Sequence, residues 1–76
     1  MTTITEDDAR ARRIAWWAAR PPEERARIAA ECDTTAEYVR LLVHGYGDRR
    51  PSVDMAKRLA AASGLARKWW LPEVWG

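Results

Sequence analysis

The polar side chains with the clearest chemistry lie in "AEYVRLLVH", residues 36–44. Glu37, Arg40 and His44 recur there at spacings of three and four residues, so a helix would place them on one face. An arginine on such a face can donate two parallel hydrogen bonds to guanine, and a glutamate can accept one from the cytosine amino group. Arg40 and Glu37 can equally pair with each other as solvated charges. This face therefore offers recognition by hydrogen bonds.

A basic loop, "GYGDRRPS", follows at residues 45–52. Arg49 and Arg50 suit phosphate oxygens, and Ser52 precedes a helix start whose free amides attract anions. Loop arginines are also commonly just solvated, and Asp54 weakens an anion site here. Residues 34–76 hold seven Lys and Arg against four acids, whereas residues 1–33 hold six Arg against seven acids. The basic second half favours a polyanion as partner.

The sequence lacks the residue combinations that catalysis and metal binding require. His44 is the only histidine, and no Ser, Cys or acid is placed to work with it as a general base. Cys32 is the only cysteine, which excludes an internal disulfide and a four-thiolate metal site. We therefore expect a protein that is not an enzyme, with no metal, no cofactor and no small-molecule substrate.

Length and hydropathy indicate one domain in an aqueous compartment. A chain of 76 residues suits a single small domain with no deep catalytic cleft. The longest apolar run, from Ile14 to Ala19, is far shorter than the roughly 20 residues of a membrane span. No charged and then apolar leader opens the sequence, so we expect a soluble, cytoplasmic protein that does not enter a membrane.

Capping residues and prolines divide the first half into short helices. Thr5 with the acids that follow it predicts a helix over about residues 6–19. The pair Pro21-Pro22 ends that helix, and Pro22 fits the first turn of the next one. Asp33-Thr34-Thr35 favours a turn and a cap, so a third helix begins after it and covers residues 36–44.

The second half is predicted in the same way. Gly45 ends the third helix in a left-handed conformation. Ser52 caps a fourth helix that continues to Gly64. In the tail, residues 65–76, we expect a short helix to about residue 70 and then an extended segment at Pro72 that returns Val74 and Trp75 to the body.

Helical spacing assigns a core face to each helix. The residues expected to face the core are Ala11, Ile14, Ala15 and Ala18 in the first helix, Ile28, Ala29 and Cys32 in the second, Val39, Leu42 and Val43 in the third, and Met55, Leu59 and Ala62 in the fourth. In the first helix Arg10, Arg13 and Arg20 are expected on another face.

Two short helices joined by a tight turn, the second with an outward polar stripe, form a helix-turn-helix. Over residues 23–76 the sequence resembles small Cro- and YdaS-like prophage regulators. The residues that carry the resemblance are Ala29, Thr35, Val39, Leu42 and Gly45, together with "RRPSVDMAKRLAAASG" and "LPEVWG" in the second half. Asp33 stands where such motifs usually have a glycine, and aspartate tolerates the left-handed conformation better than most residues.

The resemblance implies an all-α fold of four to five short helices, a lambda-repressor-like or Cro-like domain over residues 1–76 with the helix-turn-helix at about 23–45. It implies a sequence-specific DNA-binding transcription regulator, a phage- or prophage-type repressor. Because one recognition helix reads only a few base pairs, we also expect a homodimer, at least on DNA, bound to a palindromic double-stranded operator. The implied base contacts are Thr35, Ala36, Glu37, Arg40, Leu41 and His44. The implied phosphate contacts are Arg49, Arg50 and Ser52.

Five tryptophans exceed what so small a core can hold. One interpretation places Trp17 and Trp75 in the core and lets the others cover it. The other assigns Trp69 and Trp70 to a homodimer interface, because exposed aromatic residues anchor such contacts. The alternative function is a protein-interaction module, antitoxin-like or a phage protein that binds a host protein, which uses the same scaffold and its exposed tryptophans.

Overall fold

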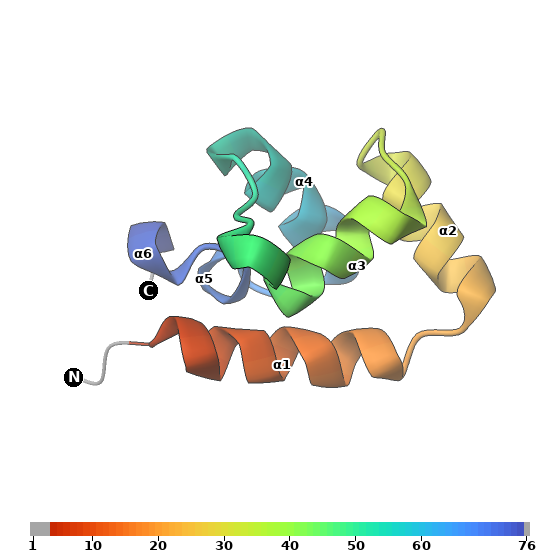
Figure 1. The fold of residues 1–76 in the computed structure, drawn as a ribbon. Helices are drawn as coiled ribbons and strands as arrows, with labels where there is room; N and C mark the ends of the chain where they lie inside the picture. Colours follow the sequence, from red (N-terminus) through yellow and green to blue (C-terminus); the bar gives the residue numbers. More distant parts are fainter. Residues whose placement is uncertain (1–3, 76) are drawn as a thin grey trace.

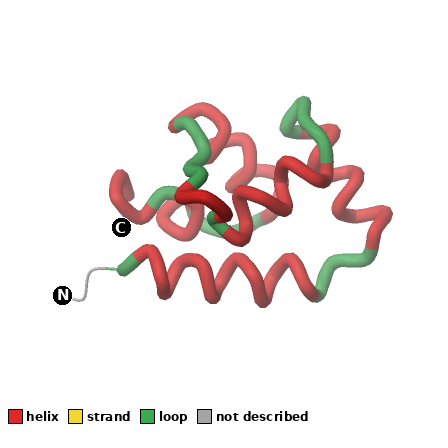
Figure 2. Tube along the Cα trace, viewed as in Figure 1, coloured by secondary structure: helices red, strands yellow, loops and turns green. Residues whose placement is uncertain are grey.

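The computed structural model describes residues 4–75, which form helices and turns and no strand (Figure 1, Figure 2). The elements in chain order are α1 (Glu6–Ala18), α2 (Pro22–Glu31), α3 (Ala36–His44), the 3₁₀ turn η1 (Tyr46–Asp48), α4 (Val53–Ser63), α5 (Arg67–Trp70) and α6 (Pro72–Trp75). The predicted all-α class is confirmed. In Figure 1, α1 lies along one side of the molecule, with α3 above it and α5 and α6 near its start.

The first helix begins as predicted but buries a different face. The Thr5 hydroxyl accepts a hydrogen bond of 3.1 Å from the Asp8 amide, which caps α1. The buried residues of α1 are Ala9, Arg13 and Trp17, at spacings of four. The large Trp17 side chain removes far more apolar surface from water than an alanine does, so its face turns inward.

The predicted core face of α1 was therefore wrong for most of its residues. Ala11, Ala15 and Ala18 are exposed, and Ile14 is only partly buried. Arg13, which we expected on an outer face, is 1% exposed. A charged residue is rarely buried unless it is paired, and partners contributed by distant segments make this burial tolerable.

The turn between α2 and α3 has the predicted geometry. Pro22 occupies the first turn of α2, and Asp33 has a positive φ of 55°. The Thr35 hydroxyl accepts a hydrogen bond of 3.1 Å from the Tyr38 amide and caps α3. Four residues, 32–35, thus separate the two helices. The interruption between the two helical segments of the sequence is therefore an ordered turn.

The third helix packs against both α1 and α2. Val39, Leu42 and Val43 are buried, as predicted. Gly45 ends α3 at a φ of 67°, and a Cβ added there would lie 3.3 Å from Arg10 Nε. Both the left-handed backbone and this close approach favour glycine.

The loop after α3 is partly ordered into η1, which the sequence did not indicate. The Ser52 hydroxyl then accepts a hydrogen bond of 3.1 Å from the Met55 amide and caps α4, as predicted. In α4 Leu59 is buried as expected, whereas Met55 and Ala62 only border the core. Ala56 is fully buried and was not expected there.

The tail differs from the predicted extended segment. Residues Pro72–Trp75 form the helix α6, whose first turn tolerates the proline. Trp70 and Leu71 are buried, whereas Val74 is exposed and Trp75 borders the core. The Trp70 indole donates a hydrogen bond of 3.3 Å to the Ser63 hydroxyl and meets Trp16 edge-on at 5.6 Å. The buried tryptophans are thus Trp17 and Trp70, and not Trp17 and Trp75.

The core contains residues from every helix except α6, extended by Leu65 and Leu71 of the tail. Its buried members are Trp17, Ala29, Cys32, Val39, Leu42, Val43, Ala56, Leu59, Leu65, Trp70 and Leu71. Within residues 4–75 no helix is long and apolar enough to cross a membrane.

Candidate nucleic-acid interface

The outer face of α3 brings together three of the predicted contact residues. Arg40 Nη2 lies 2.6 Å from Glu37 Oε1, and Arg40 Nε lies 3.2 Å from Glu37 Oε2. The guanidinium therefore forms two parallel hydrogen bonds to one carboxylate. His44 lies one turn further along the helix and is partly buried.

Tyr46 joins this face, although it was not among the predicted contact residues. Its ring stacks on His44, with centroids 5.3 Å apart and planes 15° apart. The Arg40 guanidinium carbon lies 5.7 Å from the Tyr46 ring centroid. An aromatic residue directly after the helix-ending Gly45 was the available signal, because a chain that turns back there places its next side chain beside the last helical turn.

The pair on α3 perturbs the titration of both its members. The hydrogen bonds from Arg40, helped by its charge, lower the pKa of the Glu37 carboxyl. The same hydrogen bonds and the Glu37 charge raise the pKa of Arg40 further. Both groups are therefore ionised at neutral pH, and the pair has no net charge.

The other predicted base contacts lie on or beside the same helix, but their side chains are less available to a ligand. Thr35 is exposed, but its hydroxyl oxygen already caps α3. Ala36 and Leu41 are only partly buried, and Ala36 packs against the core. Tyr38 is a large side chain of α3 that is exposed to solvent. The face therefore offers the charged pair of Glu37 and Arg40 and the stacked rings of His44 and Tyr46.

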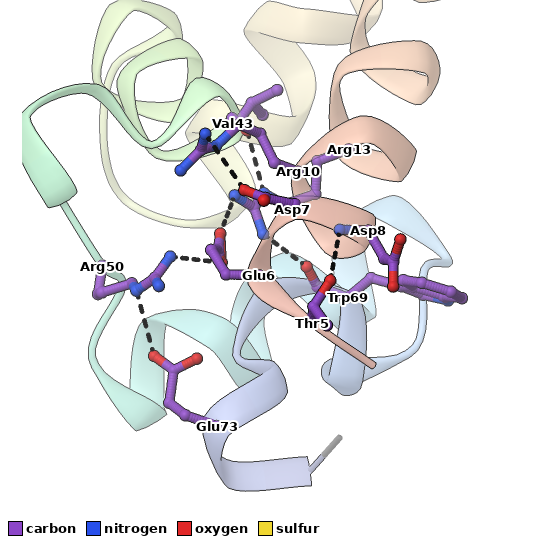
Figure 3. A network of polar contacts seen from close by, with 10 residues as sticks. All are labelled: Thr5, Glu6, Asp7, Asp8, Arg10, Arg13, Val43, Arg50, Trp69 and Glu73. Atoms are coloured by element: carbon purple, nitrogen blue, oxygen red, sulfur yellow. Dashed lines mark hydrogen bonds and ion pairs between the residues drawn. The ribbon is translucent and has the colours of Figure 1, made fainter. Parts of the chain in front are cut away.

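The predicted phosphate contacts separate into two groups. Arg49 is exposed, and within residues 4–75 no ion pair involves it. Ser52 is exposed and its hydroxyl caps α4. Arg50 instead pairs through Nη1 with Glu6 and through Nε with Glu73 at 3.3 Å (Figure 3).

The structure thus corrects the expectation for Arg50. Folding brings the start of α1 and the helix α6 to the same loop, so two carboxylates compete with any phosphate for this guanidinium. The sequence could not show this, because Glu6 and Glu73 lie far from Arg50 along the chain.

A second arginine and glutamate hold the end of α3 against α1 (Figure 3). Arg13 donates from Nε to the Val43 carbonyl at 3.0 Å, from Nη1 to the Trp69 carbonyl at 2.9 Å and from Nη2 to Glu6 at 2.7 Å. Burial raises the pKa of Glu6, but the hydrogen bonds from Arg13 and Arg50 outweigh it, so the net pKa is lowered. Arg13 therefore fixes the end of α3 from the buried side and is not available to bind a ligand.

The structure also corrects the predicted dimer interface. Trp70 is 1% exposed and belongs to the core, because its indole packs on Trp16 and bonds to Ser63. Trp69 is partly buried and borders the core. Trp70 is therefore not available as a surface anchor.

Among the described residues no cluster of three or more His, Cys, Asp or Glu side chains could hold a metal ion. Cys32 is buried, and this burial raises the pKa of its thiol, with a contribution from Glu31. Comparison of the chain with protein-family models, curated proteins and solved structures gives no match.

Proposed function

We propose that this protein binds double-stranded DNA as a helix-turn-helix regulator, with α3 in the major groove. The observation that carries the proposal is the construction of α3. One face is locked into the core by Val39, Leu42 and Val43, and the other presents Glu37, Arg40 and His44. A short helix anchored behind a tight turn, with hydrogen-bonding side chains outward, suits a groove that admits one α-helix.

The loop after α3 supports the same proposal. Arg49 is exposed and unpaired within the described range, and the first free amides of α4, those of Val53 and Asp54, lie four and five residues beyond it. Both features suit phosphate oxygens, which orient a protein on DNA without reading its sequence. In this proposal Arg49 and Ser52 contact the backbone, while Arg40 contacts a base.

One α3 helix spans only a few base pairs, so a specific site requires two copies related by two-fold symmetry. Their recognition helices would be about 34 Å apart, one turn of DNA. We therefore propose a homodimer on a palindromic operator, acting as a cytoplasmic repressor like the prophage regulators that the sequence resembles. Sedimentation with and without the selected duplex tests the dimer separately from DNA binding, and a single copy bound to a half-site contradicts it.

The direct test is selection of bound duplexes from a random pool, followed by titration of the enriched duplex at several salt concentrations. We expect an enriched motif with two-fold symmetry and a steep loss of affinity with salt, because bound phosphates release counterions. Absence of any enriched motif, with no salt-dependent binding to the pool itself, contradicts the proposal.

A second candidate is a protein-interaction module that uses the same face. The observations that favour it are the charge-neutral pair of Glu37 and Arg40 and the exposed rings of Tyr38 and Tyr46. The tryptophans support it less than expected, since none of them is fully exposed. A tyrosine-anchored protein contact would respond weakly to salt, whereas DNA binding responds steeply.

A further inference from the structure

The guanidinium of Arg40 has two edges that can each donate a pair of parallel hydrogen bonds. Glu37 occupies the edge made by Nε and Nη2, at 3.2 Å and 2.6 Å. Within residues 4–75 Arg40 has no ion pair or hydrogen bond of normal length other than those to Glu37, although the nearby Tyr46 side chain also raises the pKa of Arg40 through its charge and a hydrogen bond. The edge made by Nη1 and the second hydrogen of Nη2 therefore has no carboxylate on it and can donate a pair of hydrogen bonds to a ligand.

One aromatic ring lies against the same side chain, and a second ring stacks on the first. Tyr46 lies against the guanidinium of Arg40 at 5.7 Å, and His44 stacks on Tyr46 at 5.3 Å. Arginine loses considerable rotamer freedom when it is immobilised, and a side chain already held in place loses less of it on binding. Arg40 is therefore organised before any ligand arrives.

We propose that Glu37 is a positioning residue that presents the free edge of Arg40 to a guanine in the major groove. This inference rests on the proposed DNA binding and adds a base to it. Guanine offers two adjacent acceptors, N7 and O6, on its major-groove edge. Adenine places a donor beside its N7, and thymine places a methyl group beside its one acceptor, so neither matches two guanidinium donors.

The charge of Glu37 gives this arrangement a second consequence. A carboxylate near the groove repels phosphates, so it weakens binding to every duplex equally, while its effect on Arg40 favours one base. Glu37 therefore lowers non-specific affinity and raises discrimination. A residue that served only to stabilise the start of α3 would not produce opposite changes in these two quantities.

The test uses the selected duplex with 7-deazaguanine substituted at one guanine at a time, which removes the N7 acceptor and keeps O6. For the wild-type protein we expect a loss of about tenfold or more at one guanine of each half-site. Arg40→Ala should remove this sensitivity. Glu37→Ala should reduce it to about threefold or less and should tighten binding to an unrelated duplex.

Two further variants control for charge and folding. Glu37→Gln keeps one oxygen that can accept from Arg40, so its sensitivity should lie between those of wild type and Glu37→Ala. Asp7→Ala removes an acid that is also in the first turn of its helix and also pairs with an arginine three residues on, Arg10 at 3.8 Å. It should retain the full wild-type sensitivity at the same guanine.

The outcomes distinguish the role of Glu37 from DNA binding by α3. If Glu37→Ala and Glu37→Gln both keep the wild-type loss with 7-deazaguanine, Glu37 does not position Arg40, and DNA binding by α3 is unaffected. If Arg40→Ala keeps it, Arg40 does not read that guanine. Failure of the wild-type protein to bind any duplex overturns the proposed function and this inference together.

Discussion

Two arginine–glutamate pairs of nearly equal length occupy opposite environments in this protein. Arg13 and Glu6 are 2.7 Å apart, and their side chains are 2% and 18% exposed. Arg40 and Glu37 are 2.6 Å apart, with 39% and 67% exposed. Arg13 also binds two backbone carbonyls from distant segments, whereas Arg40 adds only the face of Tyr46. The chemistry is shared and only the surroundings differ.

The difference shows that burial, and not the pairing itself, decides what an arginine does. A buried pair cannot lose one member without leaving an uncompensated charge and unpaired carbonyls, so it serves the structure. An exposed pair is screened by water and adds little to stability, so its arginine remains accessible to a further partner.

The buried pair is broken most directly by Arg13→Met, which keeps much of the volume and removes every donor. We expect the free energy of unfolding to fall by about 3–5 kcal/mol, because Glu6 and the carbonyls of Val43 and Trp69 lose their partner. Chemical denaturation measures this loss. The matched variant Arg40→Met should keep an unfolding midpoint near that of wild type, and equal losses in the two variants would refute the contrast.

Acid should weaken the buried pair through Glu6. Its pKa is lowered from 4.5 in the folded protein, so its contribution to stability is complete above about pH 4.5 and is lost as pH falls through the lower folded value. At pH 7, Glu6→Gln should cost about 1.5–3 kcal/mol, the usual contribution of a hydrogen bond to a charged group.

Denaturation of wild type and Glu6→Gln between pH 7 and pH 2 provides the measurement. The wild-type curve should fall more steeply below pH 4.5, and the two curves should converge in acid. Glu37 also has a lowered pKa, but it is exposed, so Glu37→Gln should hardly change the pH dependence of stability. Parallel curves for wild type and Glu6→Gln would contradict this prediction.

The loop offers a neighbouring pair of arginines for the same comparison. Arg49→Ala should weaken binding to all duplexes and lower the slope of log affinity against log salt by about one. Arg50→Ala should leave that slope close to wild type and cost about 0.5–1 kcal/mol of stability, since Arg50 already pairs with Glu6 and Glu73. Salt titration of both variants decides, and equal slopes would show that Arg50 leaves its carboxylates to bind phosphate.

The smallest effect is expected at Asp33, which belongs to neither pair. Asp33→Gly should change the free energy of unfolding by less than about 1 kcal/mol, in the stabilising direction, because the native φ of 55° suits glycine. Thermal denaturation beside wild type measures it. A clear loss of stability would mean that the Asp33 side chain itself supports the turn that positions α3.

Local sequence determined where the longer helices begin and end. Thr5, Thr35 and Ser52 each cap a helix through an amide three residues ahead, and Gly45 and Gly64 each end one at positive φ. These interactions involve residues within one turn of each other, so they can be recognised without knowing the fold. The same holds for the polar face of α3, whose members lie three and four residues apart.

Tertiary structure alone decided which charged and aromatic side chains are buried. The carbonyls that Arg13 binds belong to residues 30 and 56 positions away, and nothing near Arg13 in the sequence signals them. Contacts with distant segments likewise decide that Trp70 and not Trp75 is buried in the core. They also decide that Arg50 is paired with carboxylates, while Arg49 has no ion pair within the described range. Helix ends depend on neighbours along the chain, but burial depends on what the fold places opposite each side chain.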